Sequence, residues 1–217
     1  NQLQYLGVLD SVRIRRRGKE LGLGVFVDNG DKTTPQLVKA LKRFRIRHVS
    51  CGLNHTVAQT HDGNLYTWGD NKYGQLGLGD SRNRFVPSLI QVQREDSQRV
   101  ESFADVSSGG RHCIAVSRSG AVYTWGWNAH GQLGLGHKDD VDTPSQVLSL
   151  EKERVTQVAA GWRHTIVLSN SSGNMYAWGV CSCVNHRLRR KQSSGKKDDT
   201  LIENTIPVSI PWNQKTY

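Results

Sequence analysis

Short runs rich in β-branched and aromatic residues alternate with turn residues through the middle of the chain. Residues 55–59 (HTVAQ) and 65–69 (LYTWG) are two such runs, and an Asp-Gly pair lies between them in 61–64 (HDGN). An Asp-Gly pair flanked by β-forming runs is a strong short-range signal of a β-hairpin. The same place is filled later by 118–120 (RSG) and 171–173 (SSG). The pattern therefore predicts three antiparallel hairpins.

Proline opens the apolar stretches that follow the first two hairpins. Pro87 begins PSLIQV and Pro144 begins PSQVL. Proline has no backbone N–H to donate to a neighbouring strand, so these stretches are expected to be outer strands of their sheets.

A self-comparison of the sequence shows that one unit repeats. The pattern V-x-x-G-x-x-H, followed by Y-x-W-G, begins at Val49, Val106 and Val158. The histidines lie 57 and 52 residues apart and the tryptophans 57 and 53 apart. A glycine-rich stretch, GQLGLG, occupies 74–79 and 131–136, with a weaker copy, KELGLG, at 19–24. Four short antiparallel strands in a unit of ~55 residues correspond to one blade of a β-propeller.

These motifs resemble the regulator-of-chromosome-condensation repeat over about residues 20–180. The resemblance implies an all-β fold, and in the family a closed propeller of about seven blades. The present length allows a partial propeller of about three four-stranded blades. We expect two clear blades, a third that is truncated, and a partial unit at the start. The expected divisions are 19–180 for the repeats and 181–217 for a basic insertion followed by a C-terminal strand or tail.

Residues 1–18 (NQLQYLGVLDSVRIRRRG) carry a second resemblance, to the reactive-thiol helix region of myosin motors. Gly7 stands where the myosin hinge glycine would be. The resemblance implies a remnant of an upstream motor joined to the repeats, or a gene-model join. A basic amphipathic segment that matches by accident is the alternative. The chain contains no G-x-x-x-x-G-K-[ST] phosphate loop, so no ATP hydrolysis is expected from this piece.

The positive charge is concentrated in two flanks. The chain carries a net charge of +10, to which residues 1–50 contribute +7, residues 51–186 contribute −1, residues 187–197 contribute +6 and residues 198–217 contribute −2. Nucleic acid is therefore a candidate partner only through the basic flanks. No apolar run of ~18 residues, no secretory signal and only four cysteines are present, so we expect a cytoplasmic or nuclear protein that is neither secreted nor membrane-bound.

The recurring aromatic and histidine residues are best interpreted as structural. They are expected to anchor the blades, with each histidine bonded to a neighbouring backbone group or turn: Trp68, Trp125, Trp178, His55, His112 and His164. Equivalent positions in successive blades are spread around an axis, so the histidines are not expected to meet at a metal ion. No cofactor and no metal are expected.

The loops after each W-G element are the candidate partner-binding positions, since loops on a rigid scaffold usually carry recognition. The candidates, which include two residues that break the repeat, are Asp70, Asn71, Trp127, Asn128, His130, Trp162 and Arg163. For Asn71 and Asn128 the alternative is a role in turn geometry, which their side chains also favour.

A basic run replaces the expected GQLGxG after the third W-G. Its members are Arg187, Arg189, Arg190, Lys191, Lys196 and Lys197. The run could serve as a nuclear localisation signal or a phosphate-contacting arm, or it could be a solvated loop insertion.

The sequence contains no nucleophile, acid–base pair or phosphate cradle, so the expected function is a non-enzymatic protein-interaction propeller. It would be part of a larger scaffold or the targeting tail of a myosin-like motor. The family resemblance implies a small GTPase, a chromatin component or a motor assembly as partner. Guanine-nucleotide exchange on a small GTPase and chromatin-associated regulation are the alternatives.

Overall fold

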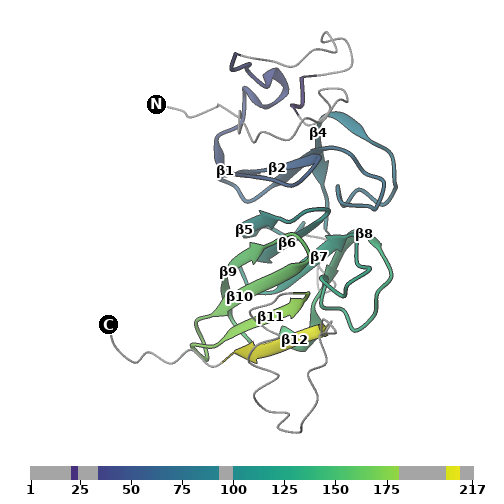
Figure 1. Cartoon of the computed structure of the whole chain (residues 1–217). Coiled ribbons are helices and arrows are strands. Elements are labelled where there is room, and N and C mark those ends of the chain that lie inside the picture. The colour runs from purple at the N-terminus through teal and green to yellow at the C-terminus, as the bar shows by residue number, and fades with distance from the viewer. Residues whose placement is uncertain (1–20, 24–33, 93–99, 181–203, 211–217) are drawn as a thin grey trace, which may run out of the picture.

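The computed structural model describes residues 21–23, 34–92, 100–180 and 204–210. Within these ranges, twelve strands form three antiparallel sheets of four strands each. The sheets follow one another along the molecule in chain order (Figure 1), and the first strand of the second sheet contacts the first strands of the other two. This is the arrangement of consecutive propeller blades, so the predicted all-β partial propeller is confirmed.

The three blades have the same strand order. Blade 1 contains β1 (Ile46–Cys51), β2 (His55–Thr60), β3 (Leu65–Gly69) and β4 (Arg84–Ile90). Blade 2 contains β5 (Phe103–Ser108), β6 (His112–Ser117), β7 (Val122–Gly126) and β8 (Val141–Gln146). Blade 3 contains β9 (Val155–Ala160), β10 (His164–Ser169), β11 (Met175–Gly179) and β12 (Asn204–Ile210). The 3-10 helices η1 (Lys39–Leu41) and η2 (Leu148–Leu150) precede β1 and β9.

The predicted hairpins and outer strands are present. Antiparallel pairing joins β2 to β3, β6 to β7 and β10 to β11, with Gly63 of the Asp-Gly pair at φ +89° in the first turn. Pro87 and Pro144 lie in β4 and β8, which are edge strands of their sheets. An edge strand leaves one row of N–H groups unpaired, so proline is tolerated there.

The expectation of a truncated third blade is wrong. Strand β12 pairs with β11, with Gly179 opposite Asn204 and Met175 opposite Ile210, and it completes the sheet. The C-terminal strand that the sequence allows within 181–217 is this fourth strand. The repeat pattern does not assign it to blade 3 because residues 181–203 separate it from β11 by a longer stretch than in blades 1 and 2. That stretch, which contains the whole basic run from Arg187 to Lys197, lies outside the described residues.

Apolar side chains from facing sheets meet at both blade junctions. Val57 and Leu65 of blade 1 share a cluster with Phe103 and Val106 of blade 2. All six residues of β2 and of β6 are buried, since these strands are covered on both faces. In β10 half-buried and buried residues alternate, which fits a sheet covered on one face by the described elements.

A partial unit covers the other face of blade 1. Val38 and Leu41 join Trp68 in a third apolar cluster, and Gly22 lies directly against the Trp68 ring, where a Cβ would stand 2.8 Å from Nε1. The weaker glycine-rich copy at 19–24 therefore belongs to the repeat. The myosin-like residues 1–18 lie outside the described residues. No helix in the described ranges has the length and apolar character needed to cross a membrane.

Candidate protein-interaction surface

The first blade junction contains a chain of hydrogen bonds that fixes the loops above it. His55 Nε2 lies 3.1 Å from Cys113 Sγ, and the Cys113 thiol donates to the Gln75 carbonyl oxygen at 3.5 Å. The same carbonyl oxygen accepts a hydrogen bond from Trp125 Nε1 at 3.0 Å. Because the thiol proton is directed to the carbonyl, the Nε2–H of His55 must be the donor to sulfur.

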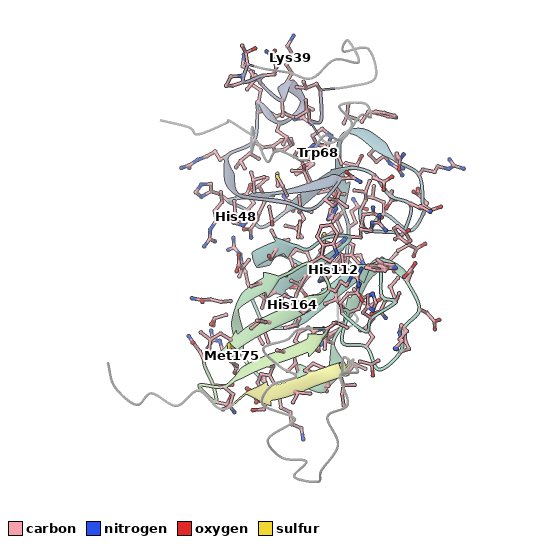
Figure 2. All side chains as sticks on the ribbon, in the orientation of Figure 1. Lys39, His48, Trp68, His112, His164 and Met175 are labelled. Carbon is pink, nitrogen blue, oxygen red and sulfur yellow. The ribbon has the colours of Figure 1, made fainter. Side chains whose placement is uncertain are left out.

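The second junction repeats this arrangement with a hydroxyl in place of the thiol. His112 Nε2 lies 3.0 Å from Thr165 Oγ1, and the Thr165 hydroxyl donates to the Gln132 carbonyl oxygen at 2.7 Å. Trp178 Nε1 donates to the same oxygen at 2.8 Å. Figure 2 labels Trp68, His112 and His164 in successive sheets. The structure places these histidines and tryptophans in the blades and at their junctions. The expected bond of each histidine to a neighbouring backbone group or turn is not what His55 and His112 make, because their Nε2 atoms bond a side chain of the next blade.

Burial keeps these histidines neutral. It lowers the pKa of His55 to about 4 and that of His112 to about 3, and partial burial lowers the pKa of His164. Burial also raises the pKa of the Cys113 thiol to about 12, so the thiol keeps the proton that it donates. Among the described residues there is no group of three or more side chains that could hold a metal ion.

Two glycines explain the spacing of the repeat motifs. A Cβ at Gly52 would stand 2.1 Å from Cε1 of the His55 ring, so the G-x-x-H turn has no room for a side chain. Gly77 adopts φ +69°, and its Cβ would stand 2.8 Å from Nε1 of Trp125. The GQLGxG loop of one blade therefore forms the seat for the tryptophan of the next.

The loop asparagines are buried within their turns. Asn71 is fully buried; its Oδ1 accepts from the Leu76 N–H and its Nδ2 donates to the Asp80 carbonyl. Asn128 is equally buried and bonds the Leu133 N–H in the same way. These amides close the loops, as the turn-geometry alternative expects, and they do not contribute to the exposed surface.

Above this frame, five side chains from three blades form the aromatic–arginine cluster, which we define as Tyr73, Arg111, Trp127, His130 and Arg163. The Arg111 guanidinium lies 5.0 Å from the centre of the Tyr73 ring and 5.8 Å from that of Trp127. Arg111 also donates to the Tyr73 hydroxyl at 3.2 Å. Arg163 lies 6.0 Å from the Trp127 ring, and His130 meets that ring edge-on at 5.1 Å. Cations and rings therefore alternate across both junctions.

The loops of blades 1 and 2 begin with different residues, and this difference changes a hydrogen bond to the loop glutamine. In blade 1, Gln75 Nε2 donates to the Asp70 carboxylate at 3.2 Å. In blade 2, Trp127 takes the place of Asp70, and Gln132 Nε2 is buried without a hydrogen-bond partner among the described residues. A buried donor left without a partner costs about 1 to 3 kcal/mol. The blade 2 loop thus carries Trp127 at the expense of a hydrogen bond.

Trp162 extends the exposed aromatic area next to the cluster. Its side chain is 56% exposed, and it lies over Gly110, where a Cβ would stand 3.3 Å from Cδ2 of the indole. Gly110 precedes Arg111 in the chain, so the indole lies beside the cluster.

The structure brings together three of the seven predicted loop residues, Trp127, His130 and Arg163, and leaves Asp70 as the partner of Gln75. Sequence reasoning missed Tyr73 and Arg111. The available signal was positional, since Arg111 precedes its histidine as Arg163 does, and Tyr73 stands where His130 stands in the next repeat.

Comparison with known proteins identifies the family of the chain. The model of the regulator of chromosome condensation (RCC1) repeat matches residues 17–59, 62–116 and 119–168, and a second RCC1 repeat model matches 46–75, 103–132 and 155–182. The chain belongs to the RCC1 repeat family. Nothing in the comparisons supports the myosin resemblance of residues 1–18, which stays an untested prediction.

Two curated relatives illustrate the similarity of this RCC1-repeat chain. It is 43% identical over 165 residues to the ultraviolet-B receptor UVR8 of Arabidopsis thaliana, covering 76% of this chain and 36% of the receptor. It is 41% identical over 149 residues to "Probable E3 ubiquitin-protein ligase HERC3" of Homo sapiens, covering 69% of this chain and 14% of that protein. The chain therefore spans about a third or less of the length of these relatives.

Two solved structures share the fold. The crystal structure of human WBSCR16 superposes with a TM-score of 0.67 at 24% identity, over 91% of this chain and 48% of that one. Prp20p of Saccharomyces cerevisiae, described together with its binding to Gsp1p and histones, superposes with a TM-score of 0.63 at 20% identity, over 83% of this chain and 41% of that one. At these identities the likeness concerns the fold alone.

Proposed function

We propose that this RCC1-repeat chain is a non-enzymatic protein-interaction module that docks a partner on the aromatic–arginine cluster. The observation that carries the proposal is the exchange of Asp70 for Trp127 between equivalent loops. A residue that only served the fold would keep the bond to the glutamine amide, as Asp70 does. A half-buried indole flanked by two arginines suits a docking surface, because tryptophan and arginine are enriched among residues that dominate binding energy.

The test uses the purified chain with the two binding partners named for Prp20p, Gsp1p and histones. A panel of small GTPases, the partner class expected from the family resemblance, is tested beside them. Trp127→Ser should weaken binding of the true partner by tenfold or more, about 1.4 kcal/mol or above. Arg118→Ala is the matched control. Arg118 follows β6 whereas Arg111 precedes it, so the control removes an exposed arginine at the other end of the same strand. Binding that survives Trp127→Ser, or that Arg118→Ala weakens equally, would contradict the proposal.

The same experiment separates the alternatives. Guanine-nucleotide exchange predicts that the chain accelerates release of labelled nucleotide from a GTPase, whereas a docking module binds without changing the release rate. A chromatin-associated role predicts selective binding of histones. If that binding depended on the basic run 187–197 and not on Trp127, the flank would be the binding element.

A further inference from the structure

The aromatic–arginine cluster holds positive charge that the fold itself does not neutralise. In the part of the chain that the structure describes, neither Arg111 nor Arg163 forms an ion pair with a carboxylate. Arg111 is half-buried and donates one N–H to the Tyr73 hydroxyl. Asp70, the first residue of the blade 1 loop, is bonded to Gln75. A guanidinium has five N–H donors in a planar fork, and the bond to Tyr73 uses one of those on Arg111.

The rings of the cluster hold the guanidinium but leave little ring face for other ligands. Lys72 Nζ lies 5.3 Å from the Tyr73 ring centre, in addition to Arg111 at 5.0 Å. The Trp127 ring has Arg111 and Arg163 close to it and His130 at its edge. Nucleic-acid bases bind by stacking on free aromatic faces. Cations lie close to the Tyr73 and Trp127 rings, so Trp162, which is 56% exposed, is the ring beside the cluster that is open to a base. The edges of the guanidinium groups remain as the groups presented to a ligand.

The surrounding charge also favours a compact anionic group over a polyanion. Residues 51–186, which include the loops that hold the cluster, sum to a net charge of −1. The excess positive charge of the described residues lies in 39–47, in the partial unit and at the start of blade 1, so the cluster itself is not part of a continuous basic stretch for a phosphate backbone. A carboxylate, by contrast, matches the planar fork of arginine through two parallel hydrogen bonds.

We infer that the aromatic–arginine cluster recognises an acidic peptide segment, with glutamate or aspartate carboxylates seated on Arg111 and Arg163. This inference rests on the proposed docking function and specifies the chemistry of the partner. It predicts that a basic segment such as a histone tail is disfavoured on this surface.

The test measures fluorescence anisotropy with the whole chain and three labelled probes: a peptide of alternating Glu and Gly residues, its Gln counterpart, and an oligothymidylate. The Glu peptide should bind most tightly. Arg111→Ala and Arg163→Ala should each weaken it roughly tenfold to a hundredfold, the range for a hydrogen-bonded charged group. Arg111→Lys should weaken binding less than Arg111→Ala, because lysine keeps the charge but loses the planar fork. Arg118→Ala should leave binding unchanged.

Four results would overturn the inference: equal binding of the Glu and Gln peptides, tighter binding of the oligothymidylate, no binding of the Glu peptide, or full binding by the Arg111→Ala and Arg163→Ala variants. If both peptides bind equally and both are lost in Trp127→Ser, the surface docks proteins without selecting acid, and only this inference fails. If Trp127→Ser weakens binding of none of the peptides and of none of the proteins in the panel, the proposed function fails as well. Arg163 is exposed, so its variant keeps the test valid if Arg111→Ala is unstable.

Discussion

Residues 70–83 and 127–140 are loops of equal length that join β3 to β4 and β7 to β8. Both close through a buried asparagine, and both offer a glutamine carbonyl to the tryptophan of the following blade. They differ at their first residue, which is Asp70 in one and Trp127 in the other. The comparison teaches that the repeat keeps what joins the blades and varies what faces outward, even where the variation leaves a buried amide without a partner.

The contact that both loops make with the tryptophan of the following blade should contribute most to stability. Trp125→Ala removes a fully buried indole and its bond to the Gln75 carbonyl, and we expect a loss of about 3 to 5 kcal/mol in the free energy of unfolding. Urea denaturation followed by circular dichroism measures it. A loss below about 1 kcal/mol would mean that the blade junction does not depend on this side chain.

The neutral histidines of the junctions should make stability depend on pH. Folding lowers the pKa of His55 from 6.5 to about 4 and that of His112 to about 3, so the unfolded chain binds more protons between those values. Stability is therefore complete above pH 6.5 and falls as the pH decreases, by up to about 1.4 kcal/mol per pH unit for each histidine. His112→Gln should reduce this slope by about one proton in urea titrations across this range. An unchanged slope would contradict the burial of His112.

The close packing of Gly77 against the Trp125 ring can be tested by comparing two glycines of similar backbone conformation. Gly77 and Gly173 have φ values of +69° and +66°, but a Cβ at Gly173 meets nothing within 4 Å. Gly173→Ala should cost about 1 kcal/mol from its left-handed backbone alone. Gly77→Ala should cost about 2 kcal/mol more, because its Cβ would overlap the Trp125 ring. Equal unfolding free energies for the two variants would contradict the close packing of Gly77 against the Trp125 ring.

The hydrogen bond between Asp70 and Gln75, which blade 2 lacks, should have a smaller effect on the free energy of unfolding. Asp70→Ala deprives Gln75 Nε2 of its acceptor and should cost about 1 to 2 kcal/mol in thermal or urea unfolding. Asp70→Asn, which keeps an acceptor oxygen, is the control and should cost less. If both variants matched the unsubstituted chain, the bond to Gln75 would contribute nothing.

The sequence predicts the blades because their determinants are local. The Asp-Gly turn at residue 63, the prolines of β4 and β8, and the spacing of His55 and Trp68 each act within one repeat. Strand β12 is expected from the sequence only as a C-terminal strand or tail somewhere in 181–217, because residues 181–203 displace it from the repeat spacing, although Pro207 marks it as an outer strand like the others. A fixed repeat spacing does not predict the length of an insertion between two strands of one blade.

The aromatic–arginine cluster is less predictable because it is assembled from different blades. Tyr73 and Arg111 are 38 residues apart in sequence, and only the stacking of blades brings the guanidinium over the ring. Trp127 and Trp162 could be singled out because they break the repeat. The unpartnered amide of Gln132 could not be foreseen, since it depends on which side chains surround it once the loop is folded.

The most direct measurement compares Trp127→Asp with Trp127→Ala, in unfolding free energy and in binding of the Glu peptide. Aspartate restores the acceptor that Asp70 provides in blade 1, so the Asp variant should be about 1 to 2 kcal/mol more stable than the Ala variant. Both variants should lose binding. Equal stability of the two, or binding that survives either substitution, would contradict the claim that this loop exchanges a structural hydrogen bond for a recognition surface.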